Sequence, residues 1–578
     1  MLDLQLAEPQ LYESPYPSIE PPTTPVWDFM FKRNNISEKE AHKIVYLEED
    51  TGEQLRSFEL QRHSFDLAHA LLQKGLRKGD MVVFFSENTI QFPVLVYALF
   101  AAGIVCSPAN SLYQPEELAY QIEDSGAAAV IVSPTRLETA KVACQLTRMS
   151  KSLYVLSDND VDGVPCLNPH QADATQQHRL GLVDAEDTAL LCYSSGTSGT
   201  PKGVQLSHGN LTSAILQAMT MTPGSFTPSE VWISVLPMAH MFGVIAHILL
   251  ATHIRATVII FRQFHLKRFA RAIETYRATV SHIVPPIAVL LTKEDMESST
   301  YDFSSLREWR TGAAPLGKDL QSLLENKWGV PVYSWYGMSE TGGIVTISDA
   351  STKLEPGALG ILAPNMTAKI LGNGELCLRG PNIMRGYQNR PKVNAETFDD
   401  EGFMHTGDVV EIHSDGYIYI LDRLKEIIKY NGYQIIKYNG YQVAPAELED
   451  LLLRHEDIND VAVIGTNDVG RATELPLAFV VLRDWMNIRD TATLDSKRSG
   501  IQDYVAERVA HHKRLRGGVI FVNKIPKRRE LHSRERSTTD ELFSPSGKIL
   551  RVKLREYLKT GWLSLSSEES QTVLTLKF

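Results

Sequence analysis

The chain has 578 residues, of which 43% are hydrophobic and 22% are charged, and its formal net charge is −11. This length exceeds what one hydrophobic core organises, so we expect at least two domains, in a composition that is ordinary for a soluble globular protein. The acidic balance, with no basic stripe, argues against nucleic-acid binding.

Apolar and amphipathic segments alternate through the first third of the chain. The first 30 residues are rich in proline and predict an extended arm. The pattern then favours helices at 66–75 and 91–103 and strands at 81–86 and 127–133. The longest apolar run, 94–106, is too short to cross a bilayer, so we expect a core helix and no membrane span. The alternation predicts helices packed on mostly parallel sheets.

The alternation continues through expected strands at 258–261 and 280–284 and changes character after Gly374. Short strands and turns follow, and Asp415-Gly416 at the centre of an apolar alternation predicts a β-hairpin. Beyond Arg423 the chain is Lys-rich and predicts a smaller α+β segment. We place a domain boundary near Lys425, which gives domains of 1–424 and 425–578.

The most informative segment is YSSGTSGTPKG, residues 193–203. Its small and hydroxyl-bearing residues offer many backbone N–H groups beside the single ammonium of Lys202, which suits a polyphosphate. A flexible linker is the alternative, but apolar strands are predicted on both sides, at 188–193 and 204–206. The order also excludes a Walker loop, because Lys202 precedes Gly203 and the next segment is predicted to be extended.

Two later segments offer groups for a nucleotide. In WYGMSET, residues 335–341, the ring of Tyr336 is suited to stack on a base and Glu340 to hold Mg²⁺, the alternative being a surface loop with a core tyrosine. The small-residue turn 311–315 would let a flat ring lie against the backbone, although loop punctuation gives the same pattern. In His405-Thr406-Gly407-Asp408, Asp408 offers a carboxylate for a ribose diol, or is a structural turn residue.

Two further positions are ambiguous by themselves. His240 lies in the apolar segment LPMAHMFG, where a lone histidine is more often packed than functional. Lys548 lies in SPSGKIL near the C-terminus, where most lysines are simply solvated.

In this order the segments resemble the adenylate-forming acyl-CoA synthetases, most closely the 4-coumarate–CoA ligase-like branch. The motifs that carry the resemblance are YSSGTSGTPKG, LPMAHMFG, TGAAPLG, YGMSE, HTGD, DRLKE, KYNGYQVAPAELE and SPSGKIL. The resemblance implies an α/β fold with a large N-terminal domain of βα-layered sheets and a small β-barrel-like part, followed by a small mobile α+β domain. It implies ATP, Mg²⁺ and coenzyme A, a small carboxylic acid as substrate, and no prosthetic group.

The resemblance also implies a role for each matching residue. Lys548 would bridge carboxylate and phosphate, Lys425 would be the hinge, and Glu340 would hold the metal. The implied ATP-binding residues are Ser194, Ser195, Gly196, Thr197, Ser198, Gly199, Thr200, Pro201, Lys202, Gly312, Ala313, Ala314, Tyr336, Gly337, Ser339, Asp408 and Arg423. The implied acyl-substrate residues are His240, Phe242, Ala246, Thr311, Trp335 and Gly343.

The chain departs from the family pattern in two places near its C-terminus. Residues 427–434 are repeated without change at 435–442, so Lys429 with Gln434 and Lys437 with Gln442 both match the positions implied to act in thioester formation. Sixteen residues, 528–543, separate segments that the family joins almost directly. Their entropic cost is about 1 kcal/mol, because loop-closure entropy grows only logarithmically, yet they could displace Lys548.

A third departure concerns the acyl pocket. Trp335 stands where 4-coumarate–CoA ligases carry a glycine before the tyrosine. An inward ring would shorten the pocket and disfavour a bulky phenylpropanoid, whereas a ring turned into the core would leave the pocket unchanged.

The leading interpretation is an ATP- and CoA-dependent ligase for a hydrophobic or aryl carboxylic acid, in specialised, toxin-type metabolism. The rival is a non-catalytic or adenylation-only paralogue, impaired by the C-terminal insertions. A light-emitting oxygenase shares the scaffold. We expect a cytoplasmic protein, because five scattered cysteines indicate a reducing compartment and the C-terminal Leu-Lys-Phe matches a peroxisomal signal poorly.

Overall fold

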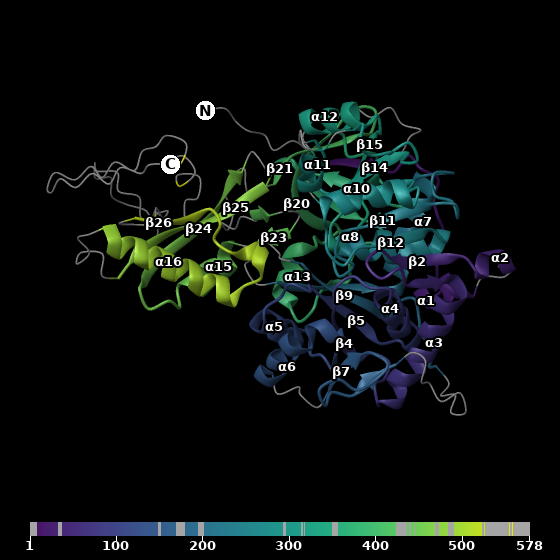
Figure 1. The fold of residues 1–578 in the computed structure, drawn as a ribbon. Coiled ribbons are helices and arrows are strands. Elements are labelled where there is room, and N and C mark those ends of the chain that lie inside the picture. The colour runs from purple at the N-terminus through teal and green to yellow at the C-terminus, as the bar shows by residue number, and fades with distance from the viewer. Residues whose placement is uncertain are drawn as a thin grey trace. The chain divides into compact units, whose positions relative to one another are not determined.

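The computed structural model describes residues 9–32, 37–147, 152–168, 180–194, 201–292, 296, 298–313, 316, 318–348, 357–423, 436–438, 441–443, 445–468, 473–483, 491–522, 525, 554 and 558. They form two compact units, one holding the described residues up to Arg423 and the other those from Ile436 onward. Helices and strands alternate through the first unit (Figure 1), so the predicted α/β class is confirmed.

One eight-stranded sheet carries the glycine- and hydroxyl-rich segment. Its order is β19 (Gly386–Tyr387), β10 (Lys202–Ser207), β9 (Thr188–Ser194), β5 (Val105–Ala109), β4 (Met81–Phe85), β6 (Ala129–Val132), β7 (Leu153–Leu156) and β8 (Cys166–Leu167). Strand β4 is buried throughout, as its unbroken apolar sequence requires inside a parallel sheet. Antiparallel pairing joins β10 to both β9 and β19.

A second eight-stranded sheet supplies the other half of the site. Its order is β16 (Thr346–Ile347), β15 (Val332–Tyr336), β14 (Glu308–Thr311), β13 (Val280–Ile283), β11 (Val231–Ser234), β12 (Thr257–Ile260), β2 (Ile44–Glu48) and β3 (Gln54–Arg56). In this order each strand from β15 through to β2 pairs in parallel with its neighbour, so the carboxyl ends of these six strands share one edge. Open parallel sheets bind ligands at this edge.

The third sheet is antiparallel and stands where the β-barrel-like part was expected. Its order is β1 (Gln10–Glu13), β17 (Thr367–Ile370), β18 (Glu375–Arg379), β20 (Met404–Ile412) and β21 (Ile418–Arg423). The predicted hairpin is confirmed, because β20 pairs with β21 across a turn in which Gly416 has φ +85°. Only glycine adopts that left-handed conformation without strain.

The helices of the first unit connect the strands of the two large sheets. Those around the first sheet are α3 (Ser57–Gln73), α4 (Gln91–Ala102), α5 (Pro115–Ser125) and α6 (Leu137–Leu146). Helix α7 (His208–Met221) contacts β9 and β10 of the first sheet. Later in the chain follow α8 (Met241–Gly243), the π-helix η3 (Val244–Leu250), α9 (Ala251–Ile254), α10 (Leu266–Thr275), α11 (Pro285–Thr292) and α12 (Lys318–Trp328). None of the helices that the structure describes is long and apolar enough to span a bilayer.

The second unit is a small α+β arrangement with its own core. A hairpin of β22 (Ile436–Tyr438) and β23 (Tyr441–Val443) accompanies a three-stranded sheet of β24 (Ile458–Asp468), β25 (Thr473–Leu482) and β26 (Gly518–Phe521). Helices α15 (Pro445–Leu452) and α16 (Thr491–Arg508) lie beside this sheet (Figure 1). Val461, Val480 and Ile501 belong to the apolar cluster between them.

Three expectations about local structure are wrong. The helix expected at 66–75 begins at Ser57, because the Glu59 carboxylate accepts the Arg56 N–H and caps it. The apolar run 94–106 is not one helix, since Gly103 ends α4 in a left-handed conformation and β5 begins at Val105. The N-terminal arm contains strand β1 and the helix α1 (Val26–Phe31), which buries its apolar face.

The turn that follows β15 tolerates no side chain at Gly337. A Cβ atom there would lie 2.2 Å from the Gly343 carbonyl oxygen, which is a backbone atom. We therefore expect Gly337→Ala to lower the free energy of unfolding by about 1–3 kcal/mol. Thermal unfolding measures this, and Gly181→Ala is the matched control, because a Cβ there has no neighbour within 4 Å. Equal unfolding midpoints for the two variants would contradict the close approach.

Candidate active site

The carboxylate of Glu340 lies where three distant segments of the chain meet. Glu340 follows β15 in the short 3-10 helix η4 (Ser339–Thr341) and is 9% exposed. Its Oε1 atom accepts hydrogen bonds from the Ser194 hydroxyl at 2.9 Å and from the Tyr387 hydroxyl at 2.9 Å. The end of β9, the turn after β15 and strand β19 are thereby joined at one oxygen atom.

Lys202 stands beside this carboxylate at the start of β10. It pairs in register with Ser194, and its Nζ atom lies 4.8 Å from the centroid of the Tyr387 ring. Burial lowers the pKa of Lys202, and the Glu340 carboxylate opposes that shift. The ammonium has therefore lost much of its hydration, and an anion bound next to it would stabilise its charge.

Hydrogen bonds join helix α5 to both ends of the glycine- and hydroxyl-rich segment, residues 193–203. The Tyr193 hydroxyl donates to Asp124 at 2.8 Å, and the Tyr120 hydroxyl donates to the Pro201 carbonyl at 2.8 Å. Arg390 forms an ion pair with Asp124 and donates to the Tyr120 hydroxyl. Residues 195–200, between these anchors, lie outside the described part of the chain.

A second pair of site residues meets at the opposite side of the turn after β15. The Tyr336 hydroxyl donates to Asp408 Oδ2 at 2.7 Å, and Asp408 is 1% exposed. Asp408 lies opposite Arg423 in the β20–β21 ladder, although only the backbone of Arg423 is described. The structure therefore brings together Tyr336, the Asp408 carboxylate and the backbone of Arg423, the three residues that the resemblance assigns to adenosine.

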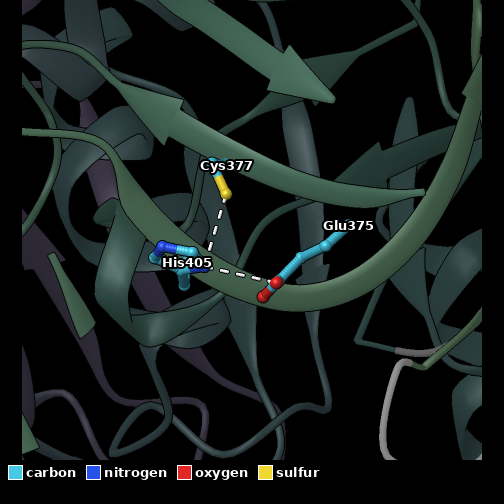
Figure 2. Close-up of side chains that lie close together, drawn as sticks. All are labelled: Glu375, Cys377 and His405. Carbon is cyan, nitrogen blue, oxygen red and sulfur yellow. Dashed lines mark hydrogen bonds and ion pairs between the residues drawn. The ribbon is translucent and has the colours of Figure 1, made fainter. Parts of the chain in front are cut away.

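Three side chains, Glu375, Cys377 and His405, meet next to the part of β20 that leads to Asp408, and Figure 2 shows their contacts. His405 Nδ1 lies 3.2 Å from Glu375 Oε2 and 3.5 Å from Cys377 Sγ. The hydrogen bond with Cys377 and then that with Glu375 raise the pKa of His405 to about 10. The ring is therefore protonated at neutral pH and donates to both partners.

The same three residues form the group of potential metal ligands found among the described residues. Their donor atoms lie within 4.8 Å of one another. However, the remaining oxygen of Glu375, Oε1, accepts the Gly407 N–H at 3.1 Å, so both oxygens are already used. These hydrogen bonds fix the backbone between His405 and Asp408.

The predicted acyl residues partly assemble into one aromatic cluster. The Trp335 indole N–H donates to the Gly343 carbonyl at 2.8 Å, and its ring lies 5.2 Å from that of Phe242. Gly343 has φ +84°, and a Cβ there would lie 2.8 Å from the Ile245 side chain. Ala246 is buried in η3 nearby in sequence. The Trp335 ring therefore points toward other predicted acyl residues.

Two predicted acyl residues, His240 and Thr311, have contacts other than those with Trp335. His240 caps α8 by accepting the Phe242 N–H at 3.3 Å, and the choice between a packed and a functional histidine stays a prediction. Thr311 pairs with Ser334 in the β14–β15 ladder, so its side chain projects from the face opposite Trp335. Lining roles for His240 and Thr311 stay predictions.

In the turn after β14 the backbone at Gly312 lies close to Trp335 and Phe242. A Cβ at Gly312 would lie 2.9 Å from the Trp335 carbonyl oxygen and 3.2 Å from the Phe242 ring. Ala313 has φ +64°, which is unusual for a residue with a side chain. Ser339 is partly exposed at the start of η4.

The remaining predicted residues lie beyond what the structure describes. Ala314, Lys425, Lys429, Gln434 and Lys548 are in this group, together with residues 195–200. For Lys437 and Gln442 only the backbone is described, and they face each other in the β22–β23 ladder.

Sequence reasoning missed several residues of the site. Tyr387 contacts both Glu340 and Lys202, yet only the pairing of β19 with β10 brings it there, and no local pattern marks it. His247 and His282 were missed because each stands alone in an apolar segment. Their contact across 35 residues is visible only in the fold.

The His405 contacts predict a pH-dependent stability. The folded pKa of about 10 lies above the unfolded value near 6.5, so this contribution is complete below pH ~6.5 and is lost as pH rises through 10. We expect His405→Gln to lose stability at pH 6.5 and much less at pH 10, measured by thermal unfolding. The exposed His413→Gln variant is the control. Parallel pH profiles for wild type and His405→Gln would mean that the folded protein does not stabilise the charged ring.

Comparison with known proteins agrees with the arrangement of the site. The family profile described as AMP-binding enzyme matches residues 32–388, and that of the AMP-binding enzyme C-terminal domain matches 447–530. A probable CoA ligase of Humulus lupulus is 36% identical over 90% of this chain and 91% of its own length. A 4-coumarate–CoA ligase of Pinus taeda is 34% identical over 95% and 98%, respectively.

Solved structures share the fold. ATP-bound MatB from Rhodopseudomonas palustris has 26% identity and a TM-score of 0.64, covering 94% of this chain and all of that one. The amide bond synthetase McbA from Marinactinospora thermotolerans has a TM-score of 0.75 at 23% identity, over 92% and 99%, and shows the fold alone. The chain therefore belongs to the AMP-binding enzymes and, within them, to the 4-coumarate–CoA ligase-like acid–thiol ligases.

Proposed function

We propose that the protein joins a hydrophobic or aryl carboxylic acid to coenzyme A, with ATP as the activating co-substrate. In the first half-reaction a carboxylate oxygen attacks the α-phosphorus of ATP, and pyrophosphate leaves. In the second the CoA thiolate attacks the acyl carbonyl carbon, and AMP leaves. The observation that carries the proposal is the meeting of Ser194, Glu340 and Tyr387 beside Lys202.

The phosphate end of the nucleotide would lie against β9 and β10. Lys202 supplies a partly desolvated ammonium, and the Ser194 hydroxyl stands opposite it in the ladder. Because the substrates supply both attacking atoms, the protein acts by positioning and by neutralising charge. The hydroxyls and N–H groups of residues 195–200 would complete the cradle.

Glu340 fits the Mg²⁺ that the family uses. Its nearly buried carboxylate accepts two hydroxyl donors and forms no ion pair with a lysine or arginine among the described residues. A hard cation that keeps several waters and phosphate ligands needs only one or two protein carboxylates. Bound there, Mg²⁺ would neutralise part of the polyphosphate charge.

The adenosine end would lie at Tyr336, Asp408 and the turn at Gly312. The Asp408 carboxylate is held by Tyr336, which leaves it suited to accept hydrogen bonds from a ribose diol. Gly312 lets the backbone come close to Trp335 and Phe242. Arg423, opposite Asp408 in the ladder, would complete the ribose contact.

The domain division at 424/425, the hinge at Lys425 and the bridging role of Lys548 are retained as proposals. For thioester formation we favour the second copy of the repeated segment, because Lys437 and Gln442 are partners in one hairpin. Opposite residues of a two-stranded ladder are near enough to act on one ligand.

For the carboxylic-acid substrate we propose a chemical class. Trp335 beside Phe242 supports a pocket shorter than one that takes a bulky phenylpropanoid. Specialised metabolism and a cytoplasmic location are retained as proposals. One relative is named as a peroxisomal OPC-8:0-CoA ligase of Arabidopsis thaliana, so a peroxisomal location is the alternative.

The test is ATP–pyrophosphate exchange with purified protein against a panel of aliphatic and aryl acids, followed by thioester detection after adding CoA. We expect exchange and thioester with at least one acid. Exchange without thioester would leave an adenylation-only enzyme. Absence of exchange with every acid, in protein that binds Mg-ATP, would overturn the proposal in favour of a binding-only paralogue.

Tyr387→Phe isolates the contact with Glu340. It removes the hydroxyl and keeps the ring under Lys202, so we expect kcat/KM for ATP to fall about tenfold, the effect of losing one hydrogen bond to a charged group. Tyr154→Phe, at a partly exposed tyrosine of β7, is the control. Unchanged kcat/KM for ATP in Tyr387→Phe would remove Tyr387 from the site.

Lys548→Ala tests the proposed bridging lysine. We expect it to abolish adenylate formation, because the developing negative charge loses its cation, and to leave thioester formation from supplied acyl-adenylate largely intact. Single-turnover assays of each half-reaction measure the two effects separately. Equal loss in both half-reactions would contradict the assignment.

A further inference from the structure

Three polar side chains form a line through the aromatic cluster beside Trp335. Ser234 Oγ at the end of β11 lies 2.9 Å from His247 Nδ1, and His247 Nε2 lies 3.2 Å from His282 Nδ1. All three residues have an exposed fraction of 0%. The line ends at His282 Nε2, which has no hydrogen-bond partner among the described residues. A buried polar atom without a partner is costly and calls for an explanation.

Both imidazoles in this line are neutral at physiological pH. Burial lowers the pKa of His247 to about 3, and burial and then His247 hold the pKa of His282 well below its usual value. A neutral imidazole has one donor and one acceptor nitrogen. If Ser234 donates to His247, the line ends in a donor at His282 Nε2, and if Ser234 accepts, it ends in an acceptor. The Ser234 hydroxyl allows both states, since it rotates.

The ring that carries the unpartnered nitrogen borders two of the predicted acyl residues. The His282 ring lies 5.7 Å from that of Phe242 and 5.9 Å from that of Trp335. Trp335 directly precedes Tyr336, which holds Asp408 at the adenosine end. His282 also lies at the carboxyl end of β13, the edge at which open parallel sheets bind ligands. An acid whose carboxylate meets the nucleotide here would extend its hydrocarbon part among these rings.

We propose that His282 Nε2 hydrogen-bonds a neutral oxygen substituent, a hydroxyl or carbonyl, on the hydrophobic part of the acid. The inference rests on the proposed function and narrows its substrate class to oxygen-substituted acids. A plain hydrocarbon would bury the nitrogen without a partner, whereas a hydroxyl or carbonyl oxygen would supply one. Ser234 and His247 act as positioning residues, because they fix the orientation of His282.

The test uses matched acids that differ by one oxygen substituent, such as benzoate with its hydroxybenzoates and octanoate with its hydroxy- and oxo-octanoates. We expect kcat/KM in ATP–pyrophosphate exchange to favour the best oxygen-substituted acid over its parent by about tenfold or more. In His282→Leu this ratio should fall to about one, with KM for ATP unchanged. His282→Asn, which restores an amide donor and acceptor, should recover part of the ratio.

Ile283→Val, a mild change at the next position of β13, is the control and should keep the wild-type ratio. A second measurement avoids catalysis: calorimetric binding of non-hydrolysable acyl-adenylate analogues made from each acid of a pair. Tight binding of both analogues with no preference, or an equal preference in His282→Leu, overturns the role of His282 and would mean that an ordered water serves Nε2. Failure of every analogue to bind overturns the proposed function itself, and this inference with it.

Discussion

The carboxylate of Glu340 is the contact on which the proposed site depends. One of its oxygens accepts hydroxyl groups from β9 and from β19, while Glu340 itself follows β15. The first two strands belong to one large sheet and the third to the other. A charge with little access to water is stable only when its hydrogen bonds are made, so this contact constrains both sheets together. Groups far apart in sequence thereby face one small volume.

The two ends of the candidate site differ in their electrostatics. Around Lys202 and Glu340 the site offers an amine and a carboxyl group, which a polyphosphate and a divalent cation would need. Around Trp335 the groups are mainly aromatic, and Ser234, His247 and His282 form a hydrogen-bonded line that ends at Nε2 of His282, which is unpartnered within the described part of the chain. This division would suit the proposed substrates, since a nucleotide carries its charge at one end and a hydrophobic acid carries its charge at the carboxylate.

Much of the fold was predictable from sequence because burial leaves a strong pattern. Strand β4 is apolar at every position, and the β20–β21 hairpin has Asp415-Gly416 at its turn. A boundary set by a single hydrogen bond was not predictable, since α3 starts at Ser57 because of Glu59. The end of α4 at Gly103 agrees with the helix expected at 91–103.

The candidate site was predictable where its residues cluster in short motifs, as Ser194, Lys202, Glu340 and Asp408 do. Tyr387 escaped because its position depends on β19 pairing with β10, and the buried histidines escaped because each is isolated in an apolar segment. Contacts between residues distant in sequence are consequences of topology. A local pattern contains no information about them.

The partly desolvated ammonium of Lys202 has a consequence for the protein without nucleotide. Burial lowers the pKa of this lysine and the Glu340 carboxylate only partly offsets that shift, so the positive charge of Lys202 opposes folding to a small extent when no nucleotide is bound. A bound polyphosphate would surround the cation with negative oxygens, so that the charge of Lys202 would favour the folded protein. Occupancy and conformational stability are then thermodynamically linked, and the ligand-bound form withstands heat and proteolysis better than the empty one. In a cell, the nucleotide supply would thus influence the lifetime of the polypeptide as well as its turnover of acids.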